Sequence, residues 1–409
     1  MSNDYGQLSV NVYANDIGMP IENAKVIITD RNSETVIEEF LTNSSGQTPV
    51  VELPAPPVEY SLEYSNMKPY SEYNVLVQSN GFELLKVEGV QIMSTTATTQ
   101  PAKMKYRTDN ENLVRNILIS EPVLWGVYPA KIPEAEVKPL PESYSFVVLP
   151  EVVVPEYIIV HLGTPNNQQA ENVWVTYKEY IKNVACCEIY STWPAETIKA
   201  NVIAIISFTL NRVYTEWYRG KGYDFTITNS TAYDHAFSYG RNIYDKISVV
   251  VDEIFSTYLT KPEIKQPLFT QYCDGKRVNC EGMTQWGSKD LGDQGFSSIN
   301  ILKSYYGYDS FYEVAPKVAG VPKSYGGTTL TFGMTNNDVR TIQEQLNTIS
   351  NNYPKIPKLP VTGYYGEQTQ NAVKIFQEIF GLPQTGNVDF ATWYEISNIF
   401  VAVKKLSEL

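Results

Sequence analysis

One glutamate in this sequence stands where a rigidly held acid is expected, at the start of a very apolar helix. Glu196 follows Trp193 and Pro194, and proline suits a first helical turn because its missing N–H is not needed there. Residues 202–206 are all apolar, which predicts a helix buried in the centre of a domain. A carboxyl group at the start of such a helix could act as a general acid in a cleft. The alternative is structural, since acidic residues in first turns also complement the helix dipole.

Further candidate site residues lie beside this glutamate and in a glycine-rich stretch later in the chain. Aromatic rings can stack on sugars, while amide and hydroxyl groups can hydrogen-bond them. Lys199 follows Glu196 by about one turn and either faces it or lies in solvent. For each of these side chains the alternative is ordinary loop or core packing. The candidate substrate-binding residues are Tyr190, Trp193, Lys199, Gln271, Tyr272, Gln285, Trp286 and Ser288.

The cysteines and histidines argue against a metal centre and against a catalytic thiol. The chain has only two histidines, whereas zinc sites usually combine several histidines and cysteines, so we expect no metal and no cofactor. Cys186 and Cys187 are expected to be buried thiols. Cys273 and Cys280 are close enough in sequence to bridge a loop, or they remain free. No histidine pattern supports a nucleophilic cysteine.

The composition indicates a folded protein that does not bind nucleic acid. The 409 residues suggest two to four domains, and 43% hydrophobic with 19% charged residues is ordinary for a globular chain. A net charge of -13 argues against a nucleic-acid partner, which would require basic surfaces. The apolar runs are too short for a membrane span, and the N-terminus lacks the pattern of a Sec signal peptide.

The pattern of strands, prolines and helices predicts a multidomain α+β protein in four segments. Residues 1–104 contain short alternating strands between turn signals, which predicts a β-sandwich. Residues 105–157 hold seven prolines, which predicts an extended, exposed connector open to proteolysis. Residues 158–325 form an α+β unit around the Glu196 helix, and residues 331–409 form a small three-helix domain.

Several elements can be predicted within these segments. Residues 111–119 favour a short helix or strand lying on a neighbouring domain, and the pattern of residues 245–255 fits either a helix or a strand. A buried strand is expected at residues 158–163. Helices are expected at residues 174–187, 196–218 and 296–306.

The C-terminal segment resembles the three-helix peptidoglycan-binding module of type 1. The matching stretches include Gly363-Tyr-Tyr-Gly-Glu-Gln-Thr, Ala372-Val-Lys-Ile-Phe-Gln and Gly381-Leu-Pro-Gln-Thr-Gly. The sequence departs from the family at Thr362, where an aspartate is usual, and in an insertion around residues 351–360. The resemblance implies a domain that binds peptidoglycan.

The N-terminal and central segments resemble two further families. Gly18-Met-Pro-Ile-Glu-Asn-Ala-Lys-Val-Ile-Ile is similar to the carboxypeptidase-regulatory type of immunoglobulin-like domain. Glu196-Thr-Ile-Lys-Ala-Asn-Val-Ile-Ala and Gly282-Met-Thr-Gln-Trp-Gly-Ser resemble the SpoIID/LytB family. Ile205-Ile-Ser-Phe replaces that family's usual Ala-Arg-Thr-Tyr, so the chain is a divergent relative. Some members bind zinc near the position of Asp234-His235-Ala236, but no cysteine lies there and we expect no metal.

The whole layout resembles the clostridial spore cortex-lytic enzymes. This resemblance implies a zymogen in which residues 1–104 are a prodomain, activated by a germination protease cutting between Lys105 and Leu149. It also implies a location at the spore cortex or coat, and spore cortex peptidoglycan as the substrate. The implied reaction is lytic transglycosylation of the MurNAc-GlcNAc bond, which leaves 1,6-anhydro-muramic ends.

Lytic transglycosylation requires one acid/base, and Glu196 is the residue we predict for it. Its pKa would have to be raised by burial, although the field at a helix start acts in the opposite direction. Two alternative functions are a non-enzymatic peptidoglycan-binding activator of other wall hydrolases and an N-acetylmuramoyl-L-alanine amidase. Zinc amidases need several histidine ligands, which this chain lacks.

Overall fold

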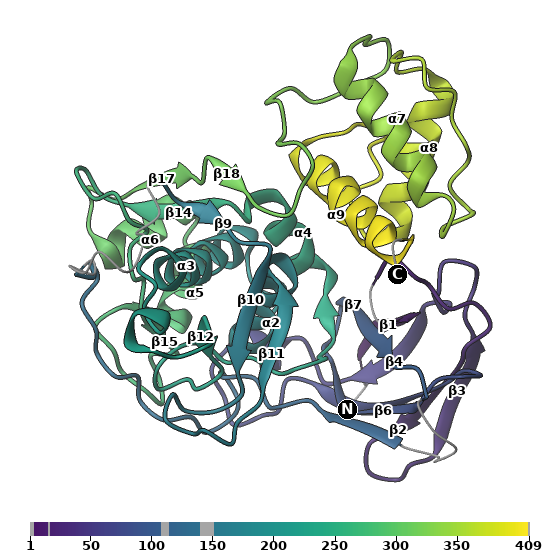
Figure 1. Ribbon diagram of the computed structural model, residues 1–409. Helices are drawn as coiled ribbons and strands as arrows, with labels where there is room; N and C mark the ends of the chain where they lie inside the picture. Colours follow the sequence, from purple (N-terminus) through teal and green to yellow (C-terminus); the bar gives the residue numbers. More distant parts are fainter. Residues whose placement is uncertain (1–3, 15–16, 108–113, 140–150, 408–409) are drawn as a thin grey trace.

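The computed structural model describes residues 4–14, 17–107, 114–139 and 151–407, which form three packed bodies (Figure 1). An N-terminal sandwich and a central α+β unit lie side by side. A C-terminal helical domain lies above the sandwich and against the central unit. The predicted multidomain α+β class is therefore confirmed.

The N-terminal sandwich consists of two β-sheets whose facing side chains form a separate apolar core. Along its first strand the buried residues alternate with more exposed ones, as the sequence pattern predicts. The first sheet contains β13 (Ile243–Tyr244), β7 (Ala97–Met104), β1 (Asp4–Ala14) and β4 (Val51–Ala55), in that order. The second contains β3 (Val36–Leu41), β2 (Lys25–Asp30), β5 (Ser71–Gln78), β6 (Leu84–Ile92) and β8 (Val114–Leu118).

Two strands that lie beyond residue 104, the predicted end of the sandwich, belong to its sheets. β8 lies in the predicted connector and pairs in parallel with β6. Of the two structures predicted for residues 111–119, the strand is therefore the one that forms. β13 comes from the central unit and pairs antiparallel with β7. The sandwich and the central unit therefore share a sheet.

The central unit is built around α3 (Ala195–Tyr214), which is buried on nearly all sides as its apolar sequence predicts. Around it pack α2 (Tyr177–Glu188), α4 (Asp245–Ile254), α5 (Gln285–Asp293), α6 (Ser298–Tyr306) and β14 (Thr257–Thr260). The short elements of this unit are β9 (Val153–Val154), β12 (Ile227–Thr228), β15 (Tyr272–Cys273), β16 (Met283–Thr284), β17 (Phe311–Val314), β18 (Lys317–Val318) and the 3-10 helix Arg219–Lys221.

One predicted helix begins later than expected. Residues 174–176 belong to β11 (Asn172–Thr176), which pairs antiparallel with β10 (Tyr157–His161), and the helix starts at Tyr177. Val173, Val175 and Thr176 are β-branched, and such residues favour strands. Residues 245–254, whose pattern fitted either structure, form the helix α4.

Residues 119–139, which we call the strap, cross the surface of the central unit without regular helix or strand. The strap is anchored along its length by backbone hydrogen bonds from Val123 N to the oxygen of Cys187, from Ile132 N to that of Ala232, and from Phe269 N to that of Glu136. The extended conformation agrees with the prediction, and side chains such as Val127 and Ile132 are exposed, but the segment is docked on the central unit by these hydrogen bonds. Of the predicted cleavage region, Lys105 to Leu149, residues 108–113 and 140–149 lie outside the described residues.

The C-terminal domain has the three predicted helices, α7 (Asn337–Ile349), α8 (Glu367–Ile379) and α9 (Phe390–Ser407). The side chain of Asn336 caps α7 by accepting a hydrogen bond from Val339 N at 2.9 Å. α9 lies against α4, where Phe390 contacts Phe255 with ring centres 5.2 Å apart.

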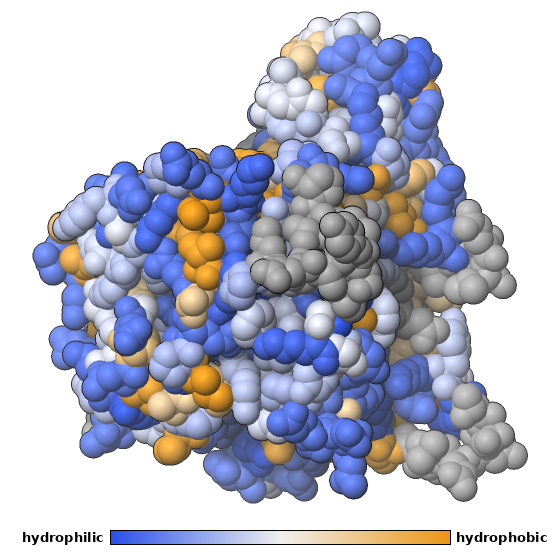
Figure 2. Space-filling view, turned by 60° about the vertical axis from the view of Figure 1, so that its left-hand side comes forward, coloured by the Kyte–Doolittle hydropathy of each residue, from blue (hydrophilic) through white to orange (hydrophobic). Residues whose placement is uncertain are grey.

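The outer surface is mainly polar on the face seen in Figure 2, where apolar residues form small separate patches. Within the described part of the chain, no helix combines the length and the apolar character that crossing a bilayer requires.

Candidate active site

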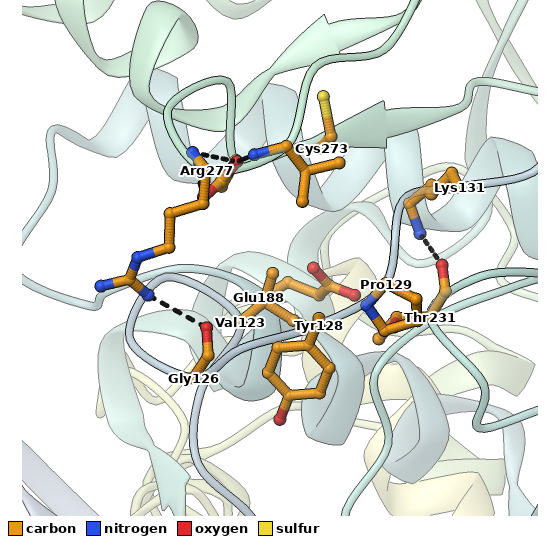
Figure 3. A pocket seen from close by; sticks show the side chains of 11 residues that line it. Val123, Gly126, Tyr128, Pro129, Lys131, Glu188, Thr231, Cys273 and Arg277 are labelled. Atoms are coloured by element: carbon orange, nitrogen blue, oxygen red, sulfur yellow. Dashed lines mark hydrogen bonds between the residues drawn. The ribbon is translucent and has the colours of Figure 1, made fainter.

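A buried carboxyl group of the central unit belongs to Glu188, the last residue of α2. Its side chain is 1% exposed, yet it lines a small cavity between the strap and a disulfide loop (Figure 3). The strap contributes Val123, Gly126, Tyr128, Pro129 and Lys131 to the lining of this cavity. The opposite wall consists of Thr231, Cys273, Asp274, Arg277 and Val278.

Hydrogen bonds fix the carboxyl group of Glu188 in this cavity. Oε1 accepts a hydrogen bond from the backbone N–H of Ala236 at 2.8 Å. Oε2 accepts one from Nε2 of Gln285 at 2.9 Å. Gln285 is itself fully buried, and Nε2 also donates to the backbone oxygen of Glu188 at 3.1 Å. The site is therefore preorganised, because both oxygens are held by groups on neighbouring elements.

Burial raises the pKa of Glu188 above its ordinary value of 4.5. The positive charge of Lys131 and the hydrogen bonds from Ala236 and Gln285 act in the opposite direction, but desolvation has the larger effect. A carboxyl group with a raised pKa can hold a proton for donation at higher pH than an ordinary glutamate. Glu188 thus has the property that the sequence analysis required of Glu196.

Lys131 brings a positive charge from the strap to this site. Its Nζ donates hydrogen bonds to the backbone oxygens of Asp234 at 2.6 Å and Thr231 at 3.2 Å, and lies 5.0 Å from the ring centre of Tyr272. Burial lowers the pKa of Lys131, while the nearby charges of Glu188 and Asp234 raise it. The strap therefore covers the cavity and also places a cation beside its carboxyl group.

The opposite wall is closed by a disulfide between Cys273 and Cys280, one of the two possibilities left open by the sequence. In this loop the carboxylate of Asp274 accepts hydrogen bonds from the backbone N–H groups of Lys276, Arg277 and Val278. Asp274 is thus engaged in the turn. Arg277 donates to the backbone oxygen of Gly126 at 3.0 Å, which ties the loop to the strap (Figure 3).

A second buried carboxylate near the strap is also fully engaged. Asp234 accepts hydrogen bonds from Nε of Arg212 at 2.8 Å and from the hydroxyl of Tyr218 at 2.7 Å. The other guanidinium nitrogens of Arg212 form a bidentate pair with Glu134 of the strap, at 2.9 and 2.7 Å. Charge neutralisation in this network stabilises the docked strap.

The structure contradicts the predicted protonation of Glu196. This side chain is largely exposed in the first turn of α3, and its Oε2 accepts a hydrogen bond from Ser298 N at 2.6 Å, at the start of α6. That hydrogen bond and Lys199 lower the pKa of Glu196, whereas burial raises it only in part. The raised pKa that the predicted role requires is therefore not present in this structure, and Glu196 does not line the cavity of Glu188. Its carboxylate caps a helix.

Three predicted site residues do gather around Glu188 and the strap. Gln285 donates a hydrogen bond to the carboxyl group, and the ring of Tyr272 lies against the ammonium group of Lys131. Gln271 donates from Nε2 to the backbone oxygen of Ile132 in the strap at 2.7 Å. These residues come from the glycine-rich stretch that the sequence analysis singled out.

The remaining predicted residues lie elsewhere. Tyr190, Trp193 and Trp286 are buried together, with ring centres 5.1 to 6.3 Å apart, so no sugar can stack on them in this structure. Ser288 is buried, and its Oγ hydrogen-bonds to the oxygen of Gln285 and accepts from Asn201. Lys199 faces Glu196 closely enough to lower its pKa.

Sequence reasoning missed Glu188, although the sequence carried a signal for it. The residue directly follows Val184-Ala-Cys-Cys, four small or apolar residues, and the predicted helix was ended one residue too early. Cys186 and Cys187 are free and buried, as predicted, and burial raises the pKa of Cys186 to about 12. An acidic residue that continues such a buried run is an unusual feature, because a buried carboxylate is costly unless it has partners.

Comparison with known proteins identifies one part of the chain. Residues 335–396 match the family of the peptidoglycan binding domain. The chain carries a peptidoglycan-binding domain. This match spans α7 and α8 and extends into α9, it confirms the corresponding prediction, and it supports association with the cell wall.

The other comparisons add little. No curated protein matches the chain. Among solved structures, the Bacillus anthracis TIE protein is 16% identical over 25% of this chain and 18% of its own, with a TM-score of 0.19. The minor pilin GBS52 of Streptococcus agalactiae is 12% identical over 28% of this chain and 49% of its own, with a TM-score of 0.19. Catechol 1,2-dioxygenase of Acinetobacter sp. ADP1 is 13% identical over 28% of this chain and 59% of its own, with a TM-score of 0.18.

Proposed function

We propose that the protein is the inactive precursor of a peptidoglycan-cleaving lytic transglycosylase, with Glu188 as its acid/base. The observation that carries this proposal is a buried carboxyl group of raised pKa, held in a cavity under the strap, in a chain with a peptidoglycan-binding domain. The resemblance to spore cortex-lytic enzymes of the SleC type gives the substrate as cortex peptidoglycan and the location as the bacterial spore. The same resemblance gives a germination protease as the activator.

The reaction needs only one carboxyl group. Protonated Glu188 donates its proton to the glycosidic oxygen as the bond to muramic acid C1 breaks. The resulting carboxylate removes the proton from the C6 hydroxyl, whose oxygen closes the 1,6-anhydro ring, so no water is consumed. Ordinary glycosidases use a second carboxylate as nucleophile or base. The carboxylates of Asp274 and Asp234 are engaged by backbone amides and by Arg212, which favours the single-acid route.

Inhibition in the precursor follows from the position of the strap. The strap fills the approach to Glu188 with Val123, Tyr128 and Pro129, and it is held by Arg277 and Arg212 of the central unit. A cut within residues 140–150 would free one end of the strap. A segment fixed at one end competes less effectively with a glycan strand than one fixed at both ends, because its effective concentration at the cleft falls.

Two alternative cuts test whether the strap or the sandwich inhibits. A recognition sequence for a specific protease is inserted either within residues 108–113 or within residues 140–150, and each purified chain is cut and mixed with cortex peptidoglycan. We expect fragment release only after the second cut, because after the first the strap is still covalently joined to the central unit and is also held through β8, which pairs with β6. Release after the first cut would contradict the proposal that the attachment at residues 140–150 keeps the strap over the site.

Mass spectrometry of the released fragments tests the reaction itself. Anhydro-muramic ends are the expected product, whereas reducing ends would indicate a hydrolase and would exclude the proposed ring closure. A cut protein that binds cortex but releases no fragments would favour the non-enzymatic activator.

A further inference from the structure

The contact between the sandwich and the central unit is more extensive than a removable inhibitor requires. β13 of the central unit forms the edge of a sandwich sheet, with Ile243 opposite Thr99 and Tyr244 opposite Thr98 of β7. The hydroxyl of Thr98 also donates to the backbone oxygen of Ile243 at 2.9 Å. If the two bodies separated, this edge of β7 would lose its partner strand.

A fully buried polar network lies beside this shared sheet. The amide of Asn242 accepts a hydrogen bond from Gln91 N at 3.2 Å, and it donates to the oxygen of Gln91 at 2.8 Å and to the hydroxyl of Thr98 at 3.0 Å. Arg241 donates to the side chain of Gln91 at 3.0 Å. Gln91 and Asn242 are both 0% exposed. Breaking such a network leaves buried donors and acceptors unpaired, which is costly for each group.

A second contact joins the sandwich to the start of α3. The indole N–H of Trp193 donates to the backbone oxygen of Ser61 at 2.9 Å, and the hydroxyl of Thr192 donates to that of Ser61 at 2.8 Å. Ser61 belongs to the short helix α1 (Glu59–Leu62) of the sandwich. Trp193, predicted to stack on a sugar, is instead an interface residue.

A third contact joins the sandwich to the C-terminal domain. Asn352 donates to the oxygen of Gly18 at 2.6 Å, and the hydroxyl of Tyr353 donates to that of Ile17. Both residues belong to the insertion at 351–360 that departs from the usual peptidoglycan-binding module. A Cβ atom on Gly18 would lie 2.8 Å from the backbone of Ala402 in α9, so the two bodies are in close contact there.

We infer that the sandwich is a permanent subunit of the processed protein, which stays bound to the central unit and the C-terminal domain after the strap is cut. This inference rests on the proposed cleavage within residues 140–150. The residues named in these three contacts lie outside residues 140–150, and Gln91 also donates from Nε2 to the oxygen of Ser120 in the strap at 2.9 Å. Cutting there therefore leaves all three contacts intact and frees only the covering of Glu188. The sandwich then holds the wall-binding domain in a fixed place beside the catalytic unit.

Size-exclusion chromatography of the chain cut within residues 140–150 tests this inference. We expect both fragments to elute together at micromolar concentration without denaturant. Asn242→Ala removes three hydrogen bonds of the network and should weaken fragment association at least about tenfold. Asn300→Ala on the exposed face of α6 is the matched control and should leave association unchanged.

The outcomes separate this inference from the proposed activity. Fragments that elute apart would overturn it, whether or not the cut protein cleaves peptidoglycan. Equal association of the Asn242→Ala and control fragments would overturn the role of the network. Hydrogen exchange of the uncut Asn242→Ala chain gives an independent readout. Amides of β7 should exchange faster than in the control while those of α8 do not change. Faster exchange throughout would mean a general folding defect and would overturn the assignment to this interface.

Discussion

Two glutamates eight positions apart occupy opposite ends of neighbouring helices and have opposite environments. Glu188 ends α2 inside the protein, whereas Glu196 begins α3 at the surface. The carbonyl groups at a helix C-terminus disfavour a negative charge, and the N–H groups at a helix N-terminus favour one. Glu196 faces two helix starts, its own and that of α6. The helix ends and the difference in burial therefore act together, raising the pKa of Glu188 and lowering that of Glu196.

This difference shows that residue type and a nearby apolar run do not identify a buried carboxyl group of raised pKa. The apolar run after Glu196 belongs to α3 and is buried in the core, but Glu196 itself points away from that core. Glu188 ends the buried helix α2, and its carboxyl group is enclosed by the strap, the disulfide loop and Gln285. What distinguishes the two residues is whether the side chain at the helix end points into the core or away from it.

The largest expected effect is on catalysis by the processed protein. Glu188→Gln should reduce release of anhydro-muramic fragments by about 10²- to 10⁴-fold, the usual contribution of a general acid. The matched variant Glu196→Gln should keep activity within a few-fold of wild type. Mass spectrometry of cortex digests measures both rates. The reverse result, in which Glu196→Gln abolishes fragment release and Glu188→Gln does not, would show that Glu196 is the catalytic acid.

A smaller effect is expected on stability at pH 7, with opposite signs for the two variants. Glu188→Gln should raise the free energy of unfolding, because a glutamate whose pKa is raised by folding destabilises the folded state at pH 7. The Oε1 of Gln285, which has no hydrogen-bond partner within the described chain, can accept from the new amide. Glu196→Gln should lower it by about 0.3 to 1 kcal/mol, the usual size of a charge at a helix start. Urea unfolding of the uncut chain measures both. Equal shifts of the same sign would contradict the contrast in environment.

The smallest effect is the pH dependence of these stability differences. The raised pKa of Glu188 makes its ionisation destabilising at high pH, and this cost disappears as the pH falls to the unfolded value of about 4.5. The lowered pKa of Glu196 gives a stabilisation that is complete above about 4.5 and is lost at lower pH. Near pH 4.5, Glu196→Gln should therefore still have a lower free energy of unfolding than wild type, while the increase caused by Glu188→Gln should be nearly absent. Thermal unfolding from pH 3 to 8 measures this; two parallel profiles would contradict it.

Much of the fold could be predicted from periodicity and turn residues. The alternation of Leu8, Val10 and Val12 gave the first strand, and the run at 202–206 gave the central helix. The strap could not be placed in the same way. Its prolines correctly excluded helix and central strand, but its docking depends on tertiary partners such as Arg212, which are distant in sequence.

The candidate site was predicted only in part. Gln271, Tyr272 and Gln285 were selected from a glycine-rich stretch, and the structure places them beside Glu188 and the strap. The sequence assigned the acid to Glu196, whereas the function proposed here assigns it to Glu188, on the other side of the loop between α2 and α3. Pairing of Glu196 with Ser298 depends on residues 102 positions apart, and local sequence contains no information on such a contact.

The pairing of β13 with β7 also has a consequence for the order of folding. Ile243 and Thr99 are far apart in sequence, so their contact closes a long loop and forms slowly compared with local structure. During synthesis the sandwich emerges first and can fold before the central unit is complete. The edge of β7 is then available when β13 is synthesised, and β13 pairs with it. A chain synthesised without its first hundred residues would lack this edge.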